Sequence, residues 1–514
     1  MAESRTAKSI KNISVALLFC ALELILKFLS RKVFLDHLGT EVLGLNTTAI
    51  SLLSFLNLAE LGIGSAVAVT LYKPLFESNR KEICEIVSLQ GWFYKRVALF
   101  VIFGSAILFC FFPLIFADMQ LPLWYAYATF SVFLFSSLLS YFANYKQILL
   151  SADQKEYKVK VSYKLPILLK LLVQIVIISI ANNGYIWWLI LEVSFAIFAT
   201  CSLSYTIKKT YPYLKTSSIP GAQLAKQYPI VLTKIKQIFV HKIASFVLSE
   251  ISPIIIYAYA SLTLVALYGN YTMIISGLVL VLNSMFNSMG AGVGNLVAEG
   301  NKQQILKVFR ELFTSRFLIV STLTLGLYLF TDSFISLWVG PEYVLDKKVL
   351  LLVVLCFYLN TMRSIVESFT YAYGLFKDIW APIAEAVLNV GFSILLGYYW
   401  GLHGILIAVN ISLFVIVFCW KPFFLFTQGL RTQLSFYIKL YVKHLLVFAP
   451  LFLILLKTRM YLNFDTSHNW ATFVFYGFVI CIMYILIAGS ILYLIESGMK
   501  GFVNRMLSLI FKKR

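Results

Sequence analysis

Charged residues are scarce in this sequence: only 13% of its 514 residues are Asp, Glu, Lys or Arg, whereas 60% are hydrophobic. A typical soluble domain carries about 25% charged residues, because its surface has to be hydrated. This shortage excludes a soluble globular protein. Long apolar runs stand where a soluble protein would have polar surface, and they predict a polytopic, all-α membrane protein.

Motifs that carry chemistry are missing as well. The seven cysteines are scattered and form no CxxC pair, so they are expected to be small core residues and not disulfide partners or metal ligands. No phosphate-binding loop and no nucleophile with a neighbouring base is recognisable in the sequence. We therefore predict a protein that is not an enzyme and has no metal or cofactor, with proton or sodium coupling left open.

The hydropathy pattern predicts about fourteen membrane-spanning helices, each at least long enough to cross a bilayer with a modest tilt. The predicted spans are 13–35, 47–71, 92–116, 123–145, 165–182, 185–206, 239–260, 264–292, 316–338, 349–374, 379–399, 403–426, 438–456 and 471–495.

Positive charge is distributed unevenly between the segments that join these spans. The formal net charge is +20, yet the segments on one side hold only Arg31, Lys32, Lys347, Lys348, Lys457 and Arg459. Since Lys and Arg concentrate in cytoplasmic loops, both termini are predicted to be cytoplasmic. Topology explains the cations well enough that no nucleic-acid partner is expected. Glu23 and Lys27 interrupt the first apolar run, and no small-residue cleavage site follows, so we expect a retained helix.

The longest polar segment, 208–237, contains three prolines and predicts a cytoplasmic linker between two halves. A weak repeat supports this division, because Asn57 and Gly64 recur at the same spacing as Asn283 and Gly290. The predicted domains are an N-terminal lobe (1–207), a C-terminal lobe (238–427), each with six helices, and an appendage (428–514) with spans 13 and 14 and a basic tail.

Nine of the ionisable residues inside the predicted spans carry most of the functional information: Glu23, Lys27, Glu60, Lys170, Glu192, Glu250, Arg363, Glu367 and Glu385. A charge at the centre of a membrane helix costs roughly 2.5–3.5 kcal/mol on insertion scales, so most of them should line a wet cavity. Two pairs, Glu23 with Lys27 and Arg363 with Glu367, are four residues apart and can form ion pairs on one helix face. Such pairs serve either function or helix packing.

The other charges in the spans have simpler expected roles. Lys170 is predicted to extend its amine to the cytoplasmic surface. Glu192 and Glu385 are predicted to be packing or hydrogen-bonding acids.

Several motifs resemble those of the bacterial polysaccharide-unit flippases of the multidrug/oligosaccharidyl-lipid/polysaccharide exporter superfamily. In the first half these are Gly39-Thr40-Glu41, Leu43–Asn46, Leu58–Ala66 and Leu71–Leu75, and in the second half Gly294–Glu299, Leu337–Tyr343, Gly374–Phe376 and Gly401–Ile405. The resemblance covers nearly the whole chain. It departs in span 7, where Glu250 stands in place of an expected Asp.

The resemblance implies a flippase of the bacterial inner membrane that moves isoprenoid pyrophosphate-linked oligosaccharides outward for O-antigen or another surface polysaccharide. Membrane lipids and other polysaccharide-assembly proteins would be its partners. Substrate binding is predicted for the cations Lys27, Arg31 and Arg363, which suit a pyrophosphate, and for Asn57, Asn270, Asn283 and Tyr371, which suit sugars. Coupling or gating is predicted for Glu23, Glu60, Glu250 and Glu367. For each neutral residue, simple helix bridging is the alternative.

Two other functions remain open from sequence alone. A cation-coupled multidrug exporter of the same superfamily would use the acids Glu23 and Glu250. A membrane glycan polymerase or ligase would handle the same lipid-linked sugars, but it would need a large external loop with catalytic residues, and the predicted external segments are short.

Overall fold

The computed structural model describes residues 5–511 apart from Leu61, Gln154, 287–289, 376–377, 379, 463–465 and 467–468. Within these limits it also leaves undescribed the side chains of 5–17, Ala59, 237–238, 240–250, 284–286, 290–292, Asn295, Ala298, 460–462 and 506–511. The described chain consists of helices and short connections, without a strand. By its contacts it divides into two compact units, Met1–Ala266 (unit 1) and Leu267–Arg514 (unit 2).

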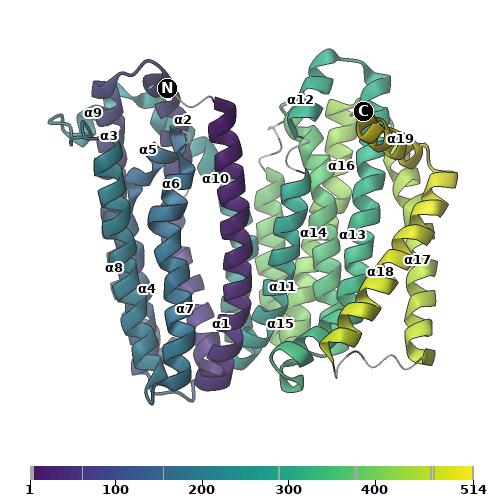
Figure 1. The fold of residues 1–514 in the computed structure, drawn as a ribbon, viewed down its shortest axis with the longest axis horizontal. Coiled ribbons are helices and arrows are strands. Elements are labelled where there is room, and N and C mark those ends of the chain that lie inside the picture. The colour runs from purple at the N-terminus through teal and green to yellow at the C-terminus, as the bar shows by residue number, and fades with distance from the viewer. Residues whose placement is uncertain are drawn as a thin grey trace. The chain divides into compact units, whose positions relative to one another are not determined.

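The helices of unit 1 are α1 (Arg5–Leu56), α2 (Ile63–Phe76), α3 (Arg80–Ile115), α4 (Trp124–Phe142), α5 (Gln147–Ala152), α6 (Glu156–Val159), α7 (Leu165–Ile180), α8 (Gly184–Thr210), α9 (Gly221–Gln227), α10 (Pro229–Tyr259) and the start of α11 (Leu262–Phe286). Within this unit α3, α4, α7 and α8 run side by side (Figure 1). Unit 2 holds the rest of α11, then α12 (Gly290–Glu299), α13 (Lys302–Trp338), α14 (Lys347–Ala372), α15 (Trp380–Ser412), α16 (Lys421–Phe424), α17 (Leu434–Leu462), α18 (Trp470–Ile495) and α19 (Ser497–Phe511).

Ten helices of the described chain are long and apolar enough to cross a membrane, and they confirm the prediction of an all-α, polytopic protein. Two continuous helical stretches are sharply kinked at glycines. Gly39 breaks α1 with a φ of 82°, and Gly401 breaks α15 with a φ of 53°. A positive φ is favourable only for glycine, so both kinks follow directly from the sequence. At Gly401 the kink separates predicted spans 11 and 12.

Large apolar side chains cover the outside of these helices. Leu99, Phe103 and Leu114 of α3 are 66%, 68% and 75% exposed, and Phe475 and Leu486 of α18 are each 63% exposed. A protein with so much exposed apolar surface would aggregate in water. It is the surface expected of helices that face lipid.

Each unit has its own aromatic core. In unit 1 the ring of Phe112 contacts that of Phe130 at 5.3 Å between centroids, which joins α3 to α4. In unit 2 Phe313 and Phe317 of α13 both contact the buried imidazole of His444 on α17. These edge-on ring contacts fix the helix pairs beyond what apolar burial alone provides.

The predicted second span, 47–71, is wrong as one continuous helix. α1 ends at Leu56, a short 3-10 helix covers Asn57–Glu60, and α2 starts only at Ile63. Gly62 stands at the N-cap of α2 with a φ of 92°, in the left-handed region. A residue in this region cannot continue a regular right-handed α-helix. The glycine next to Glu60 therefore interrupts the helix inside the apolar run.

The predicted linker 208–237 contains the end of α8, an irregular segment with turns, the short helix α9 and the start of α10. α10 packs against α1 and α2 and belongs to unit 1 by its contacts. The division into two lobes that move in a transport cycle stays a prediction.

Candidate functional site

The break between α1 and α2 places polar groups in the interior of unit 1. Glu60 ends the 3-10 turn, and its Oε1 accepts a hydrogen bond of 2.9 Å from the hydroxyl of Tyr94 on α3. Three residues earlier, Asn57 Oδ1 accepts hydrogen bonds from Tyr141 (2.7 Å) and Ser137 (3.3 Å) of α4. The acid and the amide predicted from sequence thus belong to one polar cluster, held by two helices.

Sequence reasoning missed the tyrosines of this cluster. The rings of Tyr94 and Tyr141 lie 5.6 Å apart, and Tyr94 also stacks on Tyr145. Their hydroxyls orient Glu60 and Asn57, so they position the predicted residues. The sequence contains no signal that could have identified Tyr94, because nothing in it links a tyrosine of one apolar helix to an acid of another.

The predicted cations of α1, Lys27 and Arg31, lie on the same helix face as Glu23, since the three residues follow each other at intervals of four. Lys27 forms the predicted ion pair with Glu23 at 2.8 Å, and its side chain is 53% exposed. Arg31 donates a hydrogen bond of 2.8 Å to the carbonyl of Ala266 at the start of α11. Lys27 is therefore accessible, whereas Arg31 also connects two helices.

Arg363 of α14 is the centre of the second charged group. Its Nε donates to Glu367 Oε1 at 2.6 Å, as the spacing of four predicts, and its Nη1 donates to Glu385 Oε1 of α15 at 3.0 Å. Glu385 is fully buried. One guanidinium between two carboxylates gives a triad with a formal charge of −1, so Arg363 is compensated in this structure.

The remaining predicted residues are separate from these groups or outside the described part. Asn270 is fully buried on α11, while Asn283 of the same helix and Tyr371 of α14 are exposed. Glu250 lies on α10, but its side chain is outside the described residues. The described residues contain no group of three or more side chains suited to hold a metal ion.

Lys170 corrects one expectation. Its amine does not extend to the membrane surface: it pairs with Glu192 of α8 at 2.6 Å, and the two side chains are only 15% and 12% exposed. Gln174 donates to the other oxygen of Glu192 at 3.0 Å. Glu192 is thus the hydrogen-bonding acid that was predicted, and the partner it holds is Lys170.

Comparisons with known proteins place this geometry in a known fold. No family model matches the sequence, and no curated protein matches it. Among solved structures the chain is similar to the lipid II flippase MurJ in an inward closed conformation, with a TM-score of 0.65 and 16% identity over 94% of this chain and 99% of the other. It is also similar to an inward-facing multidrug resistance MATE family transporter of the MOP superfamily, with a TM-score of 0.58 and 14% identity over 79% and 95% of the two chains. The chain therefore shares its fold with these two structures.

Proposed function

We propose that this protein is a flippase for isoprenoid pyrophosphate-linked oligosaccharides in the bacterial cytoplasmic membrane, supplying units for O-antigen or another surface polysaccharide. The observation that carries the proposal is the extent of the fold match: 94% of this chain is covered by the lipid II flippase, against 79% by the multidrug transporter. The sequence motifs that resemble polysaccharide-unit flippases support the same choice. Both matched structures are of transporters, which argues against the polymerase or ligase.

Lys27 is the best candidate for contact with the pyrophosphate. Its pair with Glu23 is half exposed, and an exposed ion pair contributes only about 0–1 kcal/mol. A pyrophosphate carries more negative charge than one carboxylate and can take over the amine at small cost. Arg363 is less suitable, because its side chain is 16% exposed and already held by two carboxylates.

Two acidic groups, Glu60 and the triad around Arg363, are suited to couple transport to an ion. Glu60 lies at a helix break inside an apolar run, where its carboxylate accepts a hydrogen bond from Tyr94. Glu367 and Glu385 share one cation, so binding of one proton or sodium ion by the triad would neutralise it. Alternating access of two lobes, with proton or sodium exchange at these acids, is the mechanism that we propose.

A multidrug exporter of the same superfamily is the second candidate. The observation that favours it is the cluster in unit 1, where Glu60 is surrounded by Tyr94 and Tyr141. An acid beside aromatic rings suits an organic cation. In that case the protein would bind a cationic drug at this cluster.

Ligand-induced stabilisation separates the two candidates. A ligand that binds only the folded protein raises its stability by RT ln(1 + [L]/Kd), about 2.7 kcal/mol at a hundredfold excess over Kd. The purified protein would be melted with an isoprenoid pyrophosphate-linked oligosaccharide, with the same isoprenoid monophosphate without sugar, and with ethidium. We expect the glycolipid to raise the melting temperature most, and Lys27→Gln to reduce that rise. Stabilisation by ethidium alone, lost in Glu60→Gln, would favour the exporter.

A further inference from the structure

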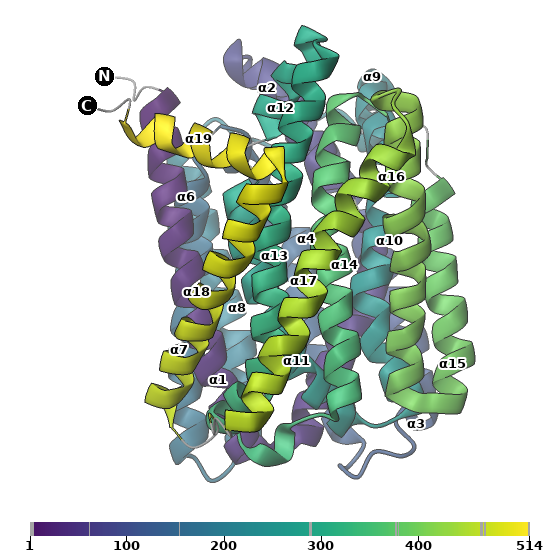
Figure 2. The same ribbon diagram turned by 90° about the vertical axis from the view of Figure 1, so that its right-hand side faces the viewer.

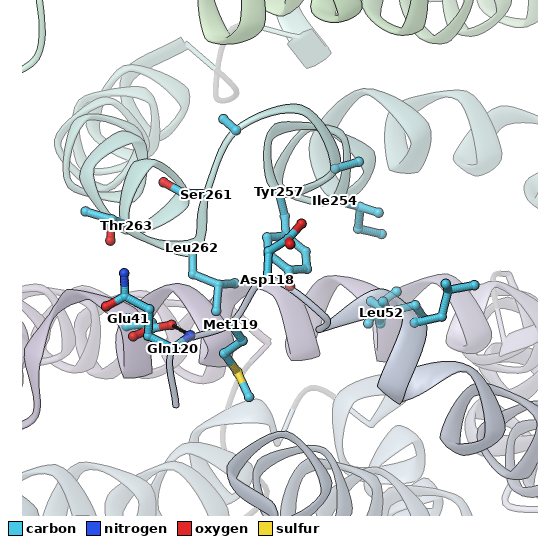
Figure 3. Close-up of a pocket in the computed structure, with 14 residues that line it drawn as sticks. Glu41, Leu52, Asp118, Met119, Gln120, Ile254, Tyr257, Ser261, Leu262 and Thr263 are labelled. Carbon is cyan, nitrogen blue, oxygen red and sulfur yellow. Dashed lines mark hydrogen bonds between the residues drawn. The ribbon is translucent and has the colours of Figure 1, made fainter. Parts of the chain in front are cut away.

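A pocket of about 460 Å³ opens at the end of unit 1 that the charge pattern predicts to be outside. Five segments line it: α1 after its kink, the end of α3, the connection between α3 and α4, the end of α10, and the turn into α11. Figure 3 shows Glu41, Gln120 and Thr263 together at one end of the pocket, with Leu52 and Ile254 at the other. The volume lies within the range of small-molecule sites, roughly 300–1,000 Å³, and is far larger than a bare ion needs.

The charge of this pocket has one sign. Glu41 and Asp118 are the charged residues of its described lining, which contains no Lys, Arg or His. Glu41 accepts a hydrogen bond of 2.6 Å from the backbone N–H of Gln120, which fixes the connection before α4 against α1. A carboxylate has about four acceptor positions, so Glu41 retains capacity for a ligand.

Tyr257 adds a donor to the acidic groups. Its hydroxyl is buried and has no hydrogen-bond partner among the described residues. The carboxylates of Asp118 and Glu41 line the same pocket as Tyr257, so the three groups are available to one ligand. The ring stacks on Phe116 with centroids 5.5 Å apart, which holds the phenol in place. A buried hydroxyl without a partner is costly, and a polar ligand would satisfy it.

We propose that this pocket binds one or two sugar residues that are neutral or carry an amino group, and that it rejects acidic sugars. Sugar hydroxyls and amines can donate to Glu41 and Asp118, and a ring or acetamido oxygen can accept from Tyr257. A uronic acid would bring a third carboxylate to Glu41 and Asp118, and the described lining holds no cation that would compensate it. Under the proposed function, on which this inference rests for the source of the glycan, the pocket would receive the sugar head on the outer side.

The test is equilibrium binding of two matched disaccharides to the full-length protein in nanodiscs of neutral lipid. One is N,N′-diacetylchitobiose, and the other has a glucuronic acid in place of one N-acetylglucosamine. We expect the neutral disaccharide to bind at least about tenfold more tightly, the effect of one unfavourable charge contact. The double variant Glu41→Gln/Asp118→Asn should weaken chitobiose binding by about tenfold and remove the discrimination.

Two single variants complete the test. Ala258→Trp fills the pocket without changing its charge and should abolish binding of both disaccharides, since Ala258 lines the pocket and is exposed. Asp36→Asn removes an exposed carboxylate of α1 that does not line the pocket and should bind like the wild type.

Three results would overturn the inference: no binding of either disaccharide at tens of millimolar, equal binding of the two by the wild type, or calcium ions binding at Glu41 and Asp118 while neither sugar does. Each of these results is compatible with transport of a lipid-linked oligosaccharide in vesicles, which would leave the proposed function standing. Disaccharide binding without such transport would support the sugar pocket and contradict the proposed function.

Discussion

At the scale of single residues, the charges inside the helices of unit 2 are strongly interdependent. Arg363 compensates both Glu367 and Glu385, and Glu385 has no exposed surface. Removing one partner of a buried ion pair costs about 3–5 kcal/mol, because the remaining charge is left buried without compensation. Arg363 therefore has to be tested for stability before any role in transport is assigned to it.

We expect Arg363→Gln to lower the free energy of unfolding by roughly 3–5 kcal/mol, and Arg363→Gln/Glu385→Gln to recover more than half of that loss. The recovery follows because the second change removes the uncompensated buried carboxylate. Unfolding of the purified variants in mixed micelles, followed by tryptophan fluorescence, gives both values. If the double variant is as unstable as the single one, the buried charge is not the cause.

The sequence predicts charge pairs well only when they are local. The pairs Glu23–Lys27 and Arg363–Glu367 could be predicted, because a spacing of four places two side chains on the same face of a helix. The bonds from Arg363 to Glu385 and from Lys170 to Glu192 join different helices, and helix periodicity contains no information on which helices pack together. For Lys170 this led to the wrong expectation of a solvated amine.

At the scale of elements, Gly62 and Gly64 provide a matched pair. Gly62 has a φ of 92°, whereas a Cβ at Gly64 would meet its nearest neighbour, the Tyr94 hydroxyl, at an ordinary 3.6 Å. Gly62→Ala should therefore cost roughly 1–2 kcal/mol of unfolding free energy, while Gly64→Ala should be neutral or stabilise by up to about 1 kcal/mol. The same unfolding measurement checks both. Equal effects would show that α2 does not depend on the left-handed glycine.

The break beside Glu60 could not be predicted from hydropathy, because 47–71 is apolar throughout and a hydropathy window does not distinguish one helix from two. The combination of an acid with two nearby glycines did indicate an unusual position. Its geometry depends on Tyr94, Tyr141 and Ser137, which stabilise the polar groups of the break from neighbouring helices.

The attachment of α19 depends on an acid at its start. Glu496 follows α18, and α19 turns away from the direction of α18 (Figure 2). Burial alone would raise the pKa of Glu496, but Lys443 at 3.0 Å and Arg310 at 3.4 Å outweigh burial and hold the pKa below its ordinary value of 4.5. A lowered pKa in the folded state contributes stability at pH values above the unfolded pKa, and this stability is lost as the pH falls through the folded pKa.

We therefore expect the amides of α19 to be well protected from hydrogen exchange at neutral pH and to lose protection below about pH 4.5, after correction for the intrinsic pH dependence of exchange. Glu496→Gln should lower the protection at neutral pH and reduce its change with pH. Glu311 with Arg505, at 2.6 Å, is a further ion pair that attaches α19 to α13. If the protection of α19 in the wild type stayed constant down to pH 3.5, about one pH unit below that value, the role of Glu496 would be contradicted.

At the scale of the whole molecule, the orientation of the chain in the membrane stays a prediction, because it rests on the distribution of cations and not on contacts between helices. Reporter fusions at Lys226 and Gly429 should be cytoplasmic, and fusions at Gln120 and Asn183 should be on the far side. Lys226 lies in α9, Gly429 at the end of a helical stretch, and Gln120 and Asn183 in the connections before α4 and α8. A cytoplasmic signal at Asn183 would overturn the assignment of inner and outer ends, including that of the pocket.

The proposed function is tested most directly by following a fluorescent isoprenoid pyrophosphate-linked oligosaccharide in sealed vesicles that contain the purified protein. A membrane-impermeant reagent that quenches the label on the outside reports the fraction that has crossed the bilayer. We expect protein-dependent crossing that is slowed in Lys27→Gln and in Glu60→Gln, at unchanged amounts of folded protein, and that ethidium does not inhibit. The contradicting result is vesicles in which a proton or sodium gradient drives ethidium transport while the labelled glycolipid stays in its original leaflet. That result would favour the exporter.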